Sequence, residues 1–129
     1  MRIAPLFALP LALLAGSSAI GQPAATLVVQ LASFKFTPST IILDHGRAYT
    51  LRLANVSGDG HDFTAPTFFA ASRISPADRG TVAEGEVEVP PHQARDIHLT
   101  APAAPGRYKL KCSHSFHKMF GMSGTIVVR

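Results

Sequence analysis

Short segments in which apolar and polar residues alternate, each ended by a glycine- or proline-rich turn, constrain the fold more than any other feature. The clearest segment runs from Arg107 to Cys112, in which every second residue from Tyr108 on is apolar. Residues 49–55 and 94–100 repeat this period of two. Because successive side chains of a β-strand point to opposite sides of its sheet, the pattern predicts strands with one buried face.

Turn residues separate further short segments along the rest of the chain. Ten glycines and ten prolines interrupt it, and no long helical pattern is present. Residues 66–83 are the least regular, and within them Phe68–Ile74 fits either a helical turn or a strand. Seven or eight short strands with such turns predict a single all-β domain, a sandwich or barrel. The further predicted strands are residues 26–36, 40–43, 61–64, 84–89 and 124–129.

The first residues are typical of an export signal. A basic start precedes an apolar stretch from Ile3 to Ala15, and small residues follow as far as Gly21. The apolar stretch is too short for a membrane-spanning helix, and two prolines interrupt it. We expect a secretion signal peptide at residues 1–21 and a single domain at residues 22–129, with cleavage after Ala19 and an uncleaved anchor as the alternatives.

The charge of the chain excludes one class of partner. Twelve Lys and Arg against eight Asp and Glu give a formal net charge of +4. Lys109, Lys111 and Lys118 form the only local basic cluster, and no basic tract of the nucleic-acid-binding type is present. We therefore expect no nucleic-acid partner. A patch of this kind could meet an acidic protein, although a solvated strand face is the more common interpretation.

Cys112 is the only cysteine of the chain. A single cysteine cannot form an internal disulfide. In the oxidising compartment of an exported protein its thiol would be exposed to oxidation unless it is buried or bound to a metal. Two histidines and two methionines follow within ten residues: His114, His117, Met119 and Met122. A thiolate with nearby imidazole and a weak thioether suits a mononuclear copper site better than other common metals. Zinc is the alternative.

Spacing narrows the set of donors. Alternation places Cys112 on the inward side at the end of a strand, so the next residues form a loop. His117 lies five residues after Cys112, and Met122 five after His117. His114 is only two residues away, a short reach for one ion. We therefore expect Cys112, His117 and Met122 as ligands, with His114 and Met119 as alternatives.

Such a site needs a second imidazole from elsewhere in the chain. His61 is the best candidate, because it follows a strand that ends at Asn55 and a glycine-rich turn. The strand, the turn and His61-Asp62-Phe63 precede Cys112 by about fifty residues, an order that resembles the cupredoxin family. Residues 34–38 and 121–128 also match the family, so the resemblance covers residues 26–129.

The resemblance implies a Greek-key β-sandwich or barrel and one type 1 copper ion. The copper would be held by His61, Cys112 and His117, with Met122 as the weak axial ligand. In many cupredoxins an asparagine after the first histidine ties the two ligand loops together. Asp62 stands at that position here, and Asp62 or Asn55 could take the role.

The resemblance also implies a function. It indicates a periplasmic blue copper protein, assuming a bacterial source, that carries single electrons between redox partners. A redox partner would dock near Phe116, Met119 and Phe120, and we expect a monomer without a membrane span after signal cleavage. No acid–base pair or substrate pocket is recognisable, so an enzyme is not expected.

Two other functions remain open at this point. The first is a periplasmic copper carrier or chaperone that delivers Cu(I) to a partner protein, because His114, Met119 and Met122 would attract Cu(I). The second is a β-sandwich that has lost its site and binds only a protein.

Overall fold

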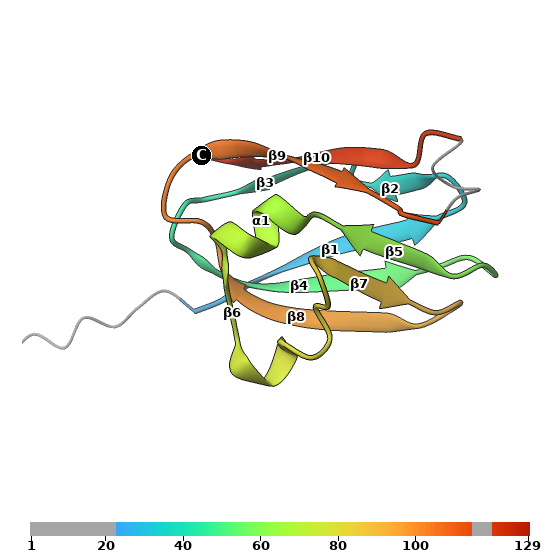
Figure 1. Ribbon diagram of the computed structural model, residues 1–129, viewed down its shortest axis with the longest axis horizontal. Helices are drawn as coiled ribbons and strands as arrows, with labels where there is room; N and C mark the ends of the chain where they lie inside the picture. The colour runs from blue at the N-terminus through green and yellow to red at the C-terminus, as the bar shows by residue number, and fades with distance from the viewer. Residues whose placement is uncertain (1–22, 115–119) are drawn as a thin grey trace, which may run out of the picture.

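Two five-stranded β-sheets packed face to face make up the molecule (Figure 1) in a computed structural model that describes residues 23–114 and 120–129. One sheet has the strand order β2-β1-β4-β8-β6 and the other β3-β10-β9-β5-β7. The prediction of an all-β sandwich is confirmed. The strands are β1 (Ala25–Ala32), β2 (Lys35–Thr37), β3 (Thr40–Leu43), β4 (Ala48–Asn55), β5 (His61–Thr64), β6 (Arg73–Ile74), β7 (Glu86–Val89), β8 (Ala94–Thr100), β9 (Gly106–Lys111) and β10 (Ser123–Val128).

Ten strands are present in the described residues, against the seven or eight predicted. The difference comes from short elements. The single stretch predicted at residues 26–36 is a hairpin, in which β1 and β2 pair antiparallel on either side of a turn. Phe34 sits in that turn with a φ of 70°. The other short element, β6, has two residues, pairs antiparallel with β8 and forms the edge of the first sheet.

The segment that the sequence left undecided contains one helical turn and one short strand. Helix α1 (Pro66–Ala71) begins with a proline, whose fixed φ suits the first helical position. Ser72 then adopts an extended backbone and leads into β6. Phe68 and Phe69 of α1 are buried in the core. A short 3₁₀ helix, η1 (Pro76–Asp78), follows β6.

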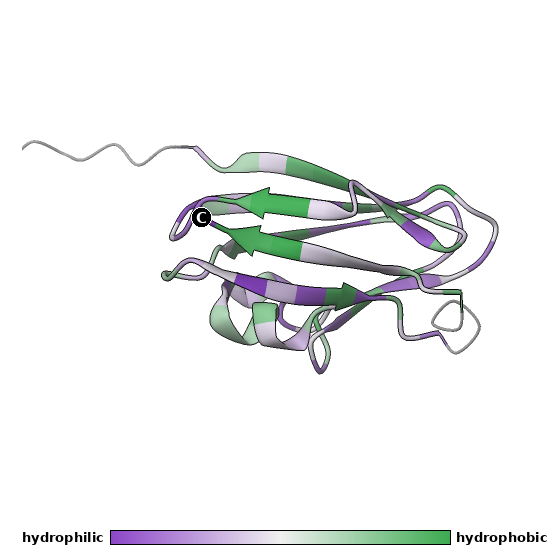
Figure 2. Ribbon diagram, turned by 90° about the horizontal axis from the view of Figure 1, so that it is seen from above, coloured by the Kyte–Doolittle hydropathy of each residue, from purple (hydrophilic) through white to green (hydrophobic). Residues whose placement is uncertain are grey.

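The predicted alternation holds in the strands that border the core. In β4 every second residue is buried, and in β9 the basic residues face solvent while Leu110 is buried. Figure 2 shows β9 with strongly hydrophilic bands separated by a paler one, followed by a hydrophobic band near the C-terminal end of the strand. The periodicity of two therefore identified which face of each strand meets the core.

Strand β5 departs from this alternation. All four of its residues are buried, although His61, Asp62 and Thr64 are polar. It lies between β9 and β7 in the second sheet. Because buried polar groups are costly unless they are hydrogen-bonded, this strand must find polar partners in neighbouring segments. Helices within residues 23–114 and 120–129 include none that is long and apolar enough to cross a membrane.

Candidate metal centre

Pairing of β9 with β10 brings the thiol and one thioether to the same end of the sandwich. Lys111 is opposite Ser123 in this antiparallel pair. One step further, the backbone N–H of Cys112 donates to the carbonyl oxygen of Met122 at 3.0 Å. The side chains of both residues are buried. The ten-residue spacing read from the sequence thus separates two residues that face each other directly after β9 and directly before β10.

His61, the first residue of β5, is fully buried. Its Nε2 lies 2.8 Å from the Oγ of Ser57. That hydroxyl can donate to Asn55 Oδ1 at 2.9 Å or to the carbonyl oxygen of Asp59 at 3.2 Å, so its lone pair can accept from an Nε2–H group. If Nε2 donates to Ser57 in this way, Nδ1 carries the lone pair through which the ring would bind a metal.

Asn55 organises the turn that leads to His61. Its Nδ2 donates to the carbonyl oxygens of Asp59 at 2.7 Å and Val89 at 3.0 Å. Its Oδ1 accepts the backbone N–H of Ser57 at 2.9 Å. These contacts hold the turn against β7. Asn55 therefore does not provide the hydrogen bonds that connect this part of the chain to Cys112 and Ser113.

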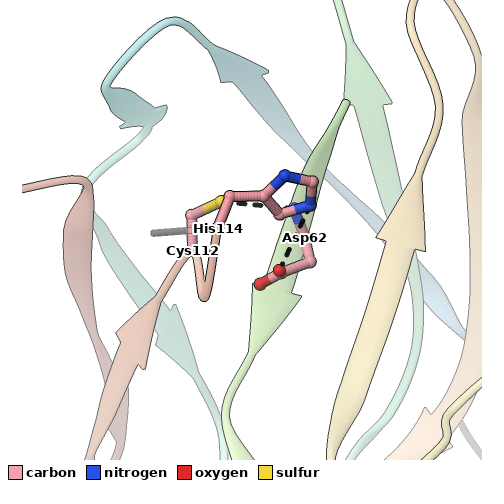
Figure 3. A group of neighbouring side chains, drawn as sticks. All are labelled: Asp62, Cys112 and His114. Atoms are coloured by element: carbon pink, nitrogen blue, oxygen red, sulfur yellow. Dashed lines mark hydrogen bonds and ion pairs between the residues drawn. The ribbon is translucent and has the colours of Figure 1, made fainter. Parts of the chain in front are cut away.

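Asp62 makes that connection. Its backbone N–H donates to Cys112 Sγ at 3.4 Å, and its Oδ1 accepts the backbone N–H of Ser113 at 2.8 Å. The hydroxyl of Ser113 donates to Oδ2 at 2.5 Å, and that of Thr64 donates to Oδ1 at 2.7 Å. Figure 3 shows the side chain of Asp62 on β5 beside Cys112 and His114. Of the two residues that the sequence offered for tying the segments, Asp62 is the one that spans them.

His114 lies at the edge of this network. Its Nε2 is 3.0 Å from Glu88 Oε1 and 3.5 Å from Asp62 Oδ2. One donor atom from each of Asp62, Cys112 and His114 lies within 4.8 Å of the other two. The carboxylates of Asp62, Glu86 and Glu88 form a second such group. His114 therefore stays close enough to the thiol to remain an alternative ligand.

Several predicted site residues fall between the two described ranges. His117, Met119 and Phe116 lie outside the described residues, as does Lys118. The structure therefore locates His61, Cys112 and Met122 of the expected ligand set. Ser57, Ser113 and Thr64 also belong to this network and were not predicted from the sequence, because their hydroxyl groups have no distinguishing spacing.

The burial of Cys112 affects the charge that its sulfur can carry. Burial raises the pKa of the thiol above its ordinary value, although the backbone N–H of Asp62 acts in the opposite direction. A thiolate at this position therefore needs a positive charge beside it. The soft sulfur donors and the buried imidazole fit copper, because carboxylate-only sites suit harder ions.

Aromatic residues border the same end of the sandwich. The side chain of Phe120 is 55% exposed, and its ring packs at a tilt of 35° against Phe34 with centroids 4.7 Å apart. Phe34 belongs to the β1–β2 turn and was not part of the apolar surface predicted from the sequence. Its contact with Phe120 joins the first hairpin to the end of the Cys112–Met122 segment.

Comparison with known proteins places these features in a wider group. A family model described as a cupredoxin-like domain matches residues 4–128. Among curated proteins, no sequence matches the chain. The family model covers the strands and the candidate metal centre together.

Solved structures resemble this chain in fold. Auracyanin B is 17% identical with a TM-score of 0.62, covering 84% of this chain and 91% of its own. Dithionite-reduced auracyanin from the photosynthetic bacterium Roseiflexus castenholzii is 18% identical with a TM-score of 0.60, covering 84% of this chain and 99% of its own. A multi-copper oxidase from Pediococcus acidilactici is 14% identical with a TM-score of 0.62, covering 80% of this chain and 25% of its own. At these identities the likeness shows the fold.

Proposed function

Because the chain belongs to the cupredoxin-like domain family, we propose that it binds one type 1 copper ion and carries single electrons between redox partner proteins. The ligands would be His61, Cys112, His117 and Met122. Two observations support the proposal: Cys112 and Met122 are buried side by side, and the backbone N–H of Asp62, the residue after the buried His61, donates to the sulfur of Cys112. Copper held by such donors would supply a one-electron couple.

The surrounding residues suit electron transfer because they restrain the ligands. Pairing of β9 with β10 holds Cys112 beside Met122, and Asp62 ties Cys112 and Ser113 to β5. Ser57 holds the ring of His61. Ligands fixed by hydrogen bonds move little when the charge of the site changes, which favours rapid exchange of electrons.

The setting of this function follows from the sequence. We infer an exported, monomeric protein of the bacterial periplasm, with a signal peptide at residues 1–21 and the domain at residues 22–129. Phe116, Met119 and Phe120 would form the apolar surface on which a redox partner docks, and the exposed ring of Phe120 supports this placement. The protein would act as a carrier rather than an enzyme.

A second function has one observation in its favour. His114 lies close to both Cys112 and Asp62 and offers a set of donors that does not include His61. A site that can exchange one histidine for another suits a protein that hands Cu(I) to a partner. The alternative function is therefore a copper carrier or chaperone.

Visible spectroscopy after addition of Cu(II) to the purified protein tests the proposal. Electron transfer at a type 1 site predicts an intense thiolate-to-copper band, lost in Cys112→Ser and retained in His114→Ala. Tight Cu(I) binding without this band would favour the copper carrier. A protein that binds no copper in either oxidation state would contradict both functions.

A further inference from the structure

Three basic residues form a row on the outer face of the second sheet. Arg107, Lys109 and Lys111 are exposed and alternate along β9. At about 3.3 Å per residue the row extends roughly 13 Å. The residues opposite them on β10 are Val127, Thr125 and Ser123, so β10 places no carboxylate against the row.

A hollow lies beside this basic row. It has a volume of about 410 Å³, and its walls include Thr64, Pro66 and Thr67, which run from the end of β5 into α1. Arg107, Lys109 and Lys111 line its other side. A concave surface bordered by cations is suited to a protruding acidic group.

The charges of the basic row are available to a partner. In the part of the chain that the structure describes, no ion pair involves Arg107, Lys109 or Lys111. Other arginines are already paired, as Arg52 is with Asp96 and Arg129 with Asp44. An unpaired cation contributes its full charge to the attraction of an anionic surface.

Two glutamates of β7 lie on the far side of β5 from the basic row. Glu86 lies across β5 from Lys111, since Thr64 pairs with both residues. Glu86 Oε2 lies 3.4 Å from the hydroxyl of Ser113, whose proton goes to Asp62, and Glu88 Oε1 lies 3.0 Å from Nε2 of His114. The negative charges of Glu86 and Glu88 repel an acidic partner on the β7 side of the basic row, so such a partner would be oriented along β9.

The basic row also ends at the candidate metal centre. Lys111 is bonded directly to Cys112, so the Lys111 end of the row lies one peptide unit from the thiol ligand, and the Arg107 end lies roughly 13 Å further along β9. We propose that Arg107, Lys109 and Lys111 dock an acidic patch of the redox partner, a second contact beside the aromatic surface. That the partner is a redox protein rests on the proposed function, whereas the basic surface itself rests on the described residues.

The length of the basic row favours a protein over a nucleic acid. Three charges over roughly 13 Å match a small, transient protein contact. Nucleic-acid binding relies on many phosphate contacts along a longer track. Electrostatic attraction of this kind acts mainly on the rate of encounter and weakens as salt is added.

Titration with model anions tests the surface. The ¹⁵N-labelled protein, with ascorbate to keep any copper as Cu(I), is titrated at low ionic strength with octaglutamate and separately with an eight-nucleotide single-stranded DNA. Octaglutamate should shift the amide signals of residues 64–67 and 106–111. Lys109→Glu/Lys111→Glu should weaken its binding about tenfold, and the milder Lys109→Gln/Lys111→Gln should give an intermediate loss.

Arg73 of β6, in the other sheet, and Arg79, directly after η1, serve as the matched control. Arg73→Glu/Arg79→Glu changes the net charge by the same amount and should leave octaglutamate binding within about twofold. Equal losses in the two Glu variants would overturn the proposal, because net charge alone would then explain binding. Tighter binding of the DNA than of octaglutamate would overturn it as well.

Electron transfer supplies the second readout. In the copper-loaded protein, oxidation by hexacyanoferrate(III), which accepts one electron from Cu(I), should slow about fivefold in Lys109→Glu/Lys111→Glu and remain unchanged in the control. An unchanged oxidation rate in both variants would overturn the claim that the basic row lies where redox partners exchange electrons with the copper. The amide titration does not need copper, so its failure is distinct from the absence of a thiolate–copper band.

Discussion

Asp62 is the residue that joins the two halves of the candidate metal centre. Its carboxylate accepts hydrogen bonds from Ser113 and Thr64, and its backbone N–H donates to the sulfur of Cys112. An asparagine could keep most of this geometry, but it would remove the negative charge. Geometry and charge can therefore be separated by one substitution.

Asp62→Asn should raise the reduction potential of the copper-loaded protein. A carboxylate favours Cu(II), the more positive ion, over Cu(I), so its removal favours reduction. For one charge a few Å from the metal at an effective dielectric constant near 20, the shift is on the order of 100 mV. A spectroelectrochemical titration measures it.

An exposed carboxylate nearby provides the comparison. Asp59→Asn removes the same charge from a solvated turn, where screening should reduce the shift to a small fraction of that in Asp62→Asn. Equal shifts in the two variants would show that the buried position of Asp62 has no special effect on the potential.

Ser57 is expected to act on affinity through His61. Ser57→Ala removes the hydroxyl 2.8 Å from Nε2, so the ring loses the contact that fixes its tautomer and orientation. Loss of such a contact typically lowers metal affinity by about 10- to 100-fold. Competition titration with a copper chelator measures the change, and Ser39→Ala, at an exposed position, should have no effect.

At the scale of elements, the start of β7 packs tightly on the start of α1. Gly85 has a φ of +74°, and a Cβ atom there would lie 2.4 Å from the Cα of Pro66. The carbonyl oxygen of Gly85 also accepts the backbone N–H of Ala65 at 3.0 Å. This contact helps fix a helix whose N-cap residue, Ala65, makes no side-chain capping bond.

Gly85→Ala should therefore lower the free energy of unfolding by about 3 kcal/mol, from the strained φ and the forced displacement of Pro66. Gly46→Ala separates the two causes, because Gly46 has a similar φ of +67° and no atom within 4 Å of the added Cβ. It should cost only about 1 kcal/mol. Urea denaturation measures both, and equal losses would contradict the steric part of the argument.

Asp78 links the η1 turn to β8 and gives stability a pH dependence. Its Oδ2 accepts the backbone N–H of His98 at 2.8 Å, and this bond is the main reason that the pKa of Asp78 lies below its ordinary value. A lowered carboxylate pKa contributes stability above the unfolded pKa, near pH 4, and this stability disappears as the pH falls through the folded value.

Asp78→Asn should accordingly cost about 1 kcal/mol at pH 7, since a charged hydrogen-bond acceptor is replaced by a neutral one. The difference from the unsubstituted protein should narrow as the pH falls below about 4. Thermal unfolding across this range measures it. A difference that stays constant with pH would show that the charge of Asp78 does not contribute.

The strands that border the core could be predicted from the sequence, and the short elements could not. Strands β4, β8 and β9 bury alternate residues, which is the pattern that period-two alternation predicts. Residues 68–74 remained undecided, because a six-residue helix and a two-residue strand are too short to establish a period. Tertiary contacts of Phe68 with Tyr108 and of Phe69 with Phe63 decide the outcome there.

For the molecule as a whole, spacing in the sequence was enough to group the donors that lie close along the chain. Grouping the more distant donors with them required the fold. Spacing predicted that Cys112 and Met122 lie at the two ends of one loop, and the pairing of β9 with β10 places them side by side. The full burial of His61 and Asp62 could not be predicted. It depends on Ser57, Ser113 and Thr64, which lie across turns and neighbouring strands.

The sandwich ties these segments together from several strands, and this rigidity distinguishes an electron carrier from a protein that releases its metal. A redox titration of the copper-loaded protein, followed by dialysis in the reduced state and a copper count, separates the two. Electron transfer predicts one reversible one-electron couple, with one copper per chain retained after reduction. Loss of the copper on reduction, or no reversible couple, would contradict the proposed function.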